Sequence, residues 1–149
     1  MKLQIATRIA LYAILDLAAD PEKQFSAGEI AERFKISGNH LSKVLRTLGR
    51  AGLVDALRGV GGGYRFSGNA KRTTLLDVIQ LFEDVGPGPD DEAEPGGRTS
   101  EGRALRSVLT EIDDTARATL SSITIATMLK LVARHRPSPR PTPKEVGAG

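Results

Sequence analysis

Four glycines stand within five positions of the stretch RGVGGGYRF, which runs from Arg58 to Phe66. Glycines beside a cation can cradle a phosphate group, so a nucleotide-binding loop has to be considered first. A Walker-type loop needs a lysine and a serine or threonine directly after its last glycine, but Tyr64 and Arg65 stand there. A dinucleotide-binding loop would open a helix, whereas the residues after Gly63 alternate between aromatic and polar side chains, as a strand does. The pattern therefore excludes both nucleotide loops.

The same glycines predict the tip of a β-hairpin. Leu53 to Arg58 form a short apolar run before them, and strand-like alternation follows them. Residues without a Cβ atom adopt the positive φ angles that a tight antiparallel turn requires. We expect Arg58 at the base of this hairpin to contact a polyanion, and Tyr64 and Phe66 to anchor the return strand.

A second group of chemically active side chains follows residue 36. Leu41, Val44, Leu45 and Leu48 predict the apolar face of a helix that begins near Asn39. Its opposite face carries hydrogen-bonding and cationic side chains. Such a face is typical of a recognition helix, which contacts base edges in the major groove of DNA near its N-terminus and phosphates through its basic residues.

The candidate contacts divide accordingly. Candidates for base-edge contacts are Ser37, Asn39, His40 and Lys43, and candidates for phosphate contacts are Arg46 and Arg50. The full set of candidate DNA-binding residues is Ser26, Ser37, Asn39, His40, Ser42, Lys43, Arg46, Thr47, Arg50, Arg58, Gly61, Gly62 and Tyr64.

The elements around these residues predict a winged helix-turn-helix domain over residues 1–72. Ile5, Ile9, Tyr12 and Leu15 have helical spacing, and Pro21 ends that first helix. The second helix begins with a predicted capping box of Ser26 and Glu29 and runs to about Phe34. The third helix follows after the short break KISG, and Gly52 lies just beyond its end. Two short helices joined by a tight turn and followed by a hairpin define this domain.

Residues 73–134 predict a second region with a different task. Thr74 and Asp77 match a capping box before the apolar helix LLDVIQLF, which we expect to stop at Gly86 and Pro87. The segment 86–100 is rich in Pro, Gly and acids and predicts a mobile loop. A long helix follows, with an apolar stripe that needs a partner surface, and Thr124 is placed to cap a final helix. The stripe comprises Leu105, Leu109, Ile112, Ala116, Ile123 and Ala126. The Pro-rich residues 135–149 predict a disordered tail.

Composition narrows the class of protein. Among the 149 residues, residues 1–72 hold twelve Lys/Arg against six Asp/Glu, while residues 73–134 hold six against eleven. A basic front half and an acidic back half favour a polyanion-binding module joined to a module with another job. Arg8 and Asp16 interrupt the apolar run near the start, and no stretch reaches the length of a membrane span, so we expect a cytoplasmic protein without a membrane partner. No nucleophile-activating combination of His, Asp and Ser is present, so we expect no enzyme.

Three of these segments resemble the IscR/NsrR-type family of bacterial transcription regulators, also called the Rrf-two family. They are the opening MKLQIATRIALYAILDLA, the helix-turn-helix AGEIAERFKISGNHLSKVLRTLGRAGLV and the hairpin RGVGGGYRF. The resemblance covers about residues 1 to 134. It implies a fold that is mainly α with a small β-hairpin, in which a winged helix-turn-helix is joined to a long dimerisation helix.

The resemblance also implies a homodimer and a function. The long helix, from about Ser100 to Thr119, would cross its mate, and each winged domain would bind half of a palindromic operator as a repressor. The stripe residues expected in the dimer interface are Leu105, Leu109, Ile112, Ala116 and Ile123.

One departure from the family limits what the resemblance implies. Many members hold an iron-sulfur cluster through three loop cysteines and a ligand near the start of the partner chain. This chain has no cysteine, and Arg8 stands where several members have an acidic ligand. The loop offers only the hard oxygen donors Asp90, Asp91, Glu92, Glu94 and hydroxyls, which do not suit a cluster. We therefore expect no cofactor and no metal, and an input other than an iron-sulfur cluster.

Two alternatives remain open at this stage. The regulator could be controlled by a protein partner through its acidic loop, or by an effector that the sequence does not identify. From a different class, the chain could be an interaction module that uses its winged-helix surface on another protein. Substitution of Lys43 and Arg46 separates the classes, because only a DNA-binding protein must then lose duplex binding.

Overall fold

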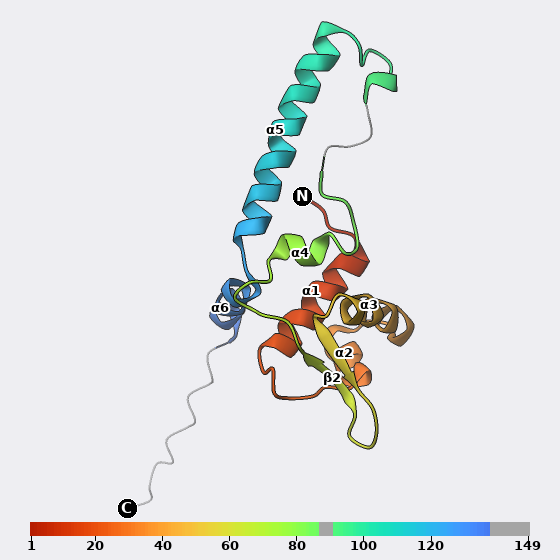
Figure 1. The fold of residues 1–149 in the computed structure, drawn as a ribbon, viewed down its shortest axis with the longest axis vertical. Coiled ribbons are helices and arrows are strands. Elements are labelled where there is room, and N and C mark those ends of the chain that lie inside the picture. The colour runs from red at the N-terminus through yellow and green to blue at the C-terminus, as the bar shows by residue number, and fades with distance from the viewer. Residues whose placement is uncertain (87–90, 138–149) are drawn as a thin grey trace, which may run out of the picture.

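A computed structural model describes residues 1–86 and 91–137 of the chain. Its elements, in order, are α1 (Ile5–Ala18), α2 (Ala27–Phe34), α3 (Gly38–Arg50), β1 (Val54–Leu57), β2 (Gly63–Phe66), α4 (Leu75–Ile79), the 3₁₀ helix η1 (Asp91–Ala93), α5 (Ser100–Ser122) and α6 (Ile125–His135). The fold is mainly helical with one two-stranded hairpin, as the sequence predicts. The start of α5 and the tip of the hairpin lie at opposite ends of the molecule (Figure 1). No helix in the described ranges is long and apolar enough to cross a membrane.

The core of the winged part is built by the inner faces of α1, α2 and α3. Ile14, Leu17, Ile30 and Leu41 are completely buried there, and Leu45 is 1% exposed. Phe66 of β2 is buried against the same cluster. The apolar stripe predicted on the third helix packs into this core, so the polar face of α3 points outward.

The stripe predicted on the first helix is only partly right. Ile9 is buried, but Ile5 and Tyr12 are 68% and 44% exposed, because the face of α1 that packs on the core is centred on Ala10, Ala13, Ile14 and Leu17.

The helix starts follow the capping residues that the sequence offers. Ser26 Oγ accepts a hydrogen bond from the Glu29 amide at 3.1 Å. Within the described residues, the Glu29 side chain makes no hydrogen bond back to the Ser26 amide, so only half of the predicted capping box is present. The Ser37 hydroxyl accepts from the His40 amide at 3.2 Å and so caps α3. At α4 the capping box is complete, since Thr74 and Asp77 each accept from the other's backbone amide.

The hairpin is antiparallel, as predicted, and its register places Val54 opposite Phe66 and Leu57 opposite Gly63. Its return strand is joined to the segment before α2, because the amides and carbonyls of Phe25 and Tyr64 exchange hydrogen bonds of 2.9 and 2.7 Å. A Cβ atom on Gly63 would lie 2.5 Å from the Phe25 carbonyl oxygen, so this contact requires glycine. Gly61 at the tip has a φ of +78°, which glycine adopts without steric cost.

One predicted helix is shorter than expected. The α-helix α4 ends at Ile79, whereas the sequence predicts helix through Phe82 and a stop at Gly86 and Pro87. The amides of Leu81 and Phe82 donate to carbonyl oxygens three residues back, so the chain tightens into turns after Ile79. Apolar composition alone did not reveal this change of hydrogen-bonding pattern.

The long helix α5 differs from the others because none of its 23 residues is buried. It extends away from the winged part (Figure 1). It ends at Ser122, and Thr124 caps α6 by accepting from the Thr127 amide at 3.1 Å, as predicted. The helix α6 reaches His135, one residue past the predicted boundary at 134, and most of the predicted tail lies outside the described residues.

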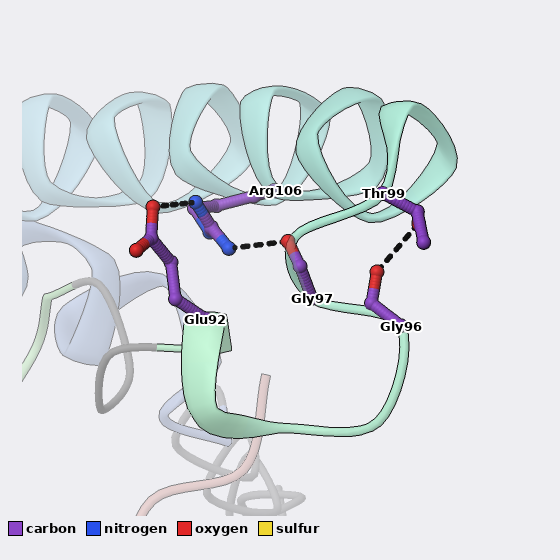
Figure 2. Close-up of polar contacts among 5 residues, drawn as sticks. All are labelled: Glu92, Gly96, Gly97, Thr99 and Arg106. Atoms are coloured by element: carbon purple, nitrogen blue, oxygen red, sulfur yellow. Dashed lines mark hydrogen bonds and ion pairs between the residues drawn. The ribbon is translucent and has the colours of Figure 1, made fainter.

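The described part of the acidic loop lies against the start of α5. Arg106 of α5 donates to the Gly97 carbonyl at 3.0 Å and pairs with Glu92 at 3.4 Å, as Figure 2 shows. Gly102 allows the close approach, since a Cβ there would lie 2.3 Å from the Gly96 carbonyl oxygen. Residues 87–90, including Asp90, lie outside the described residues, and the mobility of the loop stays a prediction.

Candidate nucleic-acid interface

The outward face of α3 carries the side chains that the sequence singles out. Its four buried residues, Leu41, Val44, Leu45 and Leu48, hold the helix on the core and leave the opposite face free. On that face and at its start, the exposed residues are Ser37, Asn39, Ser42, Lys43, Arg46 and Arg50, and the half-buried residues are His40 and Thr47. The predicted polar face is thus confirmed as a surface, while the contacts of its members with DNA stay a prediction.

The cations of this surface are not engaged elsewhere. Within the described ranges, no hydrogen bond or ion pair involves the side chains of Lys43, Arg46, Arg50 or Arg58. On the hairpin, by contrast, Arg65 pairs across the strands with Asp55 at 3.8 Å. The free cations are therefore available to phosphate groups, whereas Arg65 is already partly neutralised.

A groove separates α3 from the hairpin and brings the two parts of the candidate site together. Its volume is about 520 Å³. The helix contributes Ser42, Leu45, Arg46 and Gly49, and the hairpin contributes Val54, Ala56, Arg58 and Tyr64. Two unpaired guanidinium groups thus line one groove from opposite elements. A concave surface with cations from both sides suits the sugar-phosphate backbone of one DNA strand.

Some predicted site residues lie outside this groove. Ser26 and Ser37 serve as helix caps, and Thr47 donates its hydroxyl hydrogen bond to the Lys43 carbonyl at 3.3 Å. Gly61 and Gly62 form the hairpin tip. The first turns of α3 carry Asn39, His40 and Lys43, which do not line the groove. A recognition helix contacts bases through these first turns.

Sequence reasoning did not identify two small residues that line the groove. Gly49 lies three positions after Arg46 on the same face of α3, so helical spacing alone could have found it. Ala56 lies opposite Tyr64 in the hairpin, and only the strand register reveals its place. Gly49 has no side chain and Ala56 has only a methyl group, which leaves the groove open.

A second exposed surface lies on α5, far from the groove. The predicted stripe residues Leu105, Leu109 and Ile112 are 61%, 45% and 58% exposed, and Ala116 and Ile123 are partly exposed. Val108, which the sequence analysis did not include, is 54% exposed. It is spaced three residues after Leu105 and four before Ile112, so helical spacing places it beside them.

Side chains that could ligate a metal ion are scattered over the described part of the chain. Across residues 1–86 and 91–137, no three His, Cys, Asp or Glu side chains are grouped so that they could hold a metal ion. The surface offers instead hydrogen-bond donors, free cations and a groove beside a recognition helix.

These features define a winged helix-turn-helix DNA-binding protein. The sequence pattern of the Rrf2 family, described as iron-dependent transcriptional regulators, matches residues 3–131. The chain belongs to the Rrf2 family and is a transcriptional regulator rather than an enzyme.

Named relatives agree with this assignment. The chain is 52% identical over 136 residues to a Rhodopseudomonas palustris protein that carries the name HTH-type transcriptional regulator BadM. The match covers 91% of this chain and 86% of that protein. It is 38% identical over 85 residues to the transcriptional regulator NsrR of Bacillus subtilis, a match that covers 56% of this chain and 58% of NsrR.

Solved structures show the same fold. The B. subtilis cysteine regulator CymR matches with a TM-score of 0.75 at 26% identity, over 88% of this chain and 98% of CymR. The T. potens protein IscR matches with a TM-score of 0.73 at 26% identity, over 93% and 94% of the two chains. The fold predicted from the three sequence segments is therefore confirmed.

An iron-sulfur cluster, as one basis for the iron dependence in the description of the family, does not fit the donor atoms of this chain. An iron-sulfur cluster needs thiolate ligands, and the chain has no cysteine. In the described part of the loop, Glu92 faces Arg106, so its carboxylate lies beside a cation. The residues present do not form a cluster site, and no regulatory step through a cluster follows from them.

Proposed function

We propose that the chain is a homodimeric repressor that binds a two-fold symmetric operator in bacterial cytoplasm. The groove between α3 and the hairpin carries the DNA-binding half of this proposal, because Arg46 and Arg58 line it from two elements and neither is paired in the described ranges. The first turns of α3 would lie in the major groove, with Asn39, His40 and Lys43 next to base edges. The hairpin would contact the adjacent backbone or minor groove through Arg58.

The bare apolar face of α5 supports the dimer. Leu105, Val108, Leu109 and Ile112 expose apolar area along one side of a helix that buries none of its residues in the chain itself. An exposed stripe of this kind is typical of a helix that packs against another helix. Packing against the same stripe of a second copy would form an isologous interface and place two winged parts on successive turns of a symmetric duplex.

A selection experiment tests the DNA-binding half directly. The protein is incubated with a random-sequence duplex library, and the enriched duplexes are sequenced and used in affinity measurements. We expect enrichment of two similar half-sites in inverted orientation, with centres about one helical turn, or a multiple of it, apart. Lys43→Ala/Arg46→Ala should lose duplex binding, while Lys130→Ala, which removes an exposed cation from α6, should retain it. Retention of binding by the double variant would place the DNA contacts outside the α3 surface, and failure of the unaltered protein to enrich any duplex would favour the alternative of a protein-interaction module.

The repressor assignment needs a transcription assay with the enriched duplex placed over a promoter. The transcript level should fall when the protein is added, and a rise would show an activator instead.

The input of the regulator is proposed to differ from an iron-sulfur cluster. Anaerobic treatment of the purified protein with iron and sulfide should add no visible absorption, and its DNA affinity should not change on treatment with nitric oxide. A stoichiometric visible chromophore would contradict this part of the proposal. In that case the DNA-binding part would stand unchanged.

A further inference from the structure

The segment after α4 is held from two sides by polar contacts that belong neither to the groove nor to the apolar face of α5. Glu83 Oε2 accepts hydrogen bonds from the Gln4 amide at 2.9 Å and from the Thr7 hydroxyl at 2.5 Å. Two residues further on, the carbonyl oxygen of Val85 accepts from the Arg117 guanidinium of α5. A short piece of chain thus joins the N-terminal end of α1 to the C-terminal part of α5.

The Glu83 carboxylate supplies what α1 lacks at its own start. Gln4 is the N-cap of α1, its side chain makes no capping bond, and the first turn contains no acidic residue. A negative charge at that end stabilises the helix through its dipole. Thr7 is completely buried, so its hydroxyl has no access to water and Glu83 is the acceptor that satisfies it.

The C-terminal end of α5 is held by hydrogen bonds that do not involve Glu83 or Val85. Three backbone hydrogen bonds join the α5–α6 junction to the segment from Ala70 to Leu75, the first residue of α4. They are Leu75 to Ile123 at 2.9 Å, Ile125 to Thr73 at 2.9 Å and Ala126 to Ala70 at 2.8 Å. Arg117 lies six residues before Ile123, which is about 9 Å along a helix. A helix that is attached at one point can change its direction, whereas a second attachment about 9 Å along the helix fixes that direction.

Apolar packing alone would set this direction less sharply. The short helix α4 packs against both α1 and α5 and lies between them in Figure 1. Contact between apolar surfaces is non-directional, while hydrogen bonds require a defined distance and angle. The polar contacts of Glu83 and Val85 therefore add a second directional attachment to the backbone hydrogen bonds near Ile123.

We propose that Glu83 is a positioning residue, which fixes the orientation of α5 on the winged part and so sets the separation of the two recognition helices. The second clause rests on the proposed homodimer. The first concerns a single chain and can be tested without it. Glu83 needs no contact with DNA for this role.

The orientation is measured within one chain. Because the chain has no cysteine, spin labels can be placed on Glu22→Cys and Ala104→Cys, two exposed positions on the winged part and the N-terminal half of α5. Labelled protein is diluted with excess unlabelled protein, so that pulsed electron resonance reports distances within a chain. We expect Thr7→Val, which keeps the shape but removes the hydroxyl, and Glu83→Ala to shift or broaden the distance distribution. Thr7→Ser, which keeps the hydroxyl, should leave it unchanged.

The consequence for DNA is measured with a spacing series. The probe is the duplex enriched by the unaltered protein, together with versions lengthened by one to five base pairs at the centre. Thr7→Val and Glu83→Ala should reduce discrimination between the preferred and altered spacings by about 2- to 30-fold, the range expected for a weakened coupling element. A merely structural role would instead lower affinity for all spacings equally. Thr7→Ser, which keeps the hydroxyl, should discriminate between spacings as the unaltered protein does.

Two results would overturn the inference. They are a distance distribution that is the same in all variants, and an unchanged spacing preference in variants that dimerise. If the enriched duplexes contained single half-sites, the proposed dimer would fail, and the distance measurement would still decide the role of Glu83.

Discussion

The winged part buries the apolar faces of its helices, whereas the helix α5 leaves its apolar residues exposed. Leu45 of α3 is 1% exposed, whereas Ile112 of α5 is 58% exposed. Both lie on amphipathic helices with comparable spacing, so the pattern alone does not distinguish a core from an interface. The difference teaches that the first stripe is buried within the chain, whereas the second is left exposed by the described part of the chain and is available to another surface.

The largest expected effect contrasts the two stripes. Leu45→Ala should lower the free energy of unfolding by about 2–5 kcal/mol, because it leaves a cavity in a closed core. The loss should not depend on protein concentration. Leu105→Ala, its matched substitution on α5, should instead destabilise in a manner that changes with concentration, since the proposed contact of Leu105 is between chains. Urea denaturation at several protein concentrations measures both, and the same concentration dependence for the two variants would remove the contrast.

The second prediction concerns the dimer itself. Ile112→Lys should weaken self-association about 100-fold, because a symmetric interface loses two buried apolar side chains and gains two like charges. Ala118→Lys, an exposed change on another face of α5, serves as the control and should dimerise normally. Sedimentation over a concentration range gives the two dissociation constants. Equal constants for these variants would place the interface elsewhere.

Smaller effects are expected within the DNA-binding surface. Asn39→Ala should cost roughly 1–3 kcal/mol of binding free energy, mainly on the enriched duplex. Arg46→Ala should weaken binding to all duplexes alike and reduce the slope of affinity against salt by about one ion. Titrations on enriched and random DNA at several salt concentrations separate these effects. A uniform loss from Asn39→Ala would contradict its assignment to base contacts.

The smallest effect tests the helix cap. Ser37→Ala should lower the free energy of unfolding by about 1 kcal/mol, because the His40 amide loses its acceptor. Ser37→Asn keeps a capping oxygen and should be nearly neutral. Thermal unfolding compares the two, and equal melting temperatures for the alanine and asparagine variants would show that the cap contributes nothing.

Local chemistry explains which features were predictable. Caps at Thr74 and Thr124 and the apolar face of α3 depend on residues within a few positions of each other, and the structure confirms them. The early end of α4 depends on a change from α-helical to tighter turns, which composition does not encode. The bond between Thr7 and Glu83 joins residues 76 positions apart. Only the packing of α1 beside the end of α4 brings these two side chains together, so no spacing rule could have found them.

The candidate site was likewise predictable in part. The polar face of α3 and the free Arg58 follow from helical periodicity and from the glycine tip. The groove that joins them depends on the distance between a helix and a hairpin, which is set by buried contacts such as Phe66 against the core. The roles of individual residues toward DNA are proposals that depend on this placement.

The most direct test of the account is the stoichiometry of the protein on its duplex, measured by native mass spectrometry with the enriched symmetric duplex and with one isolated half-site. We expect two chains on the symmetric duplex, and we expect Ile112→Lys to bind it as single chains with much lower affinity. One chain per symmetric duplex for the unaltered protein, at concentrations where binding is saturated, would contradict the claim that the exposed stripe of α5 joins two winged domains.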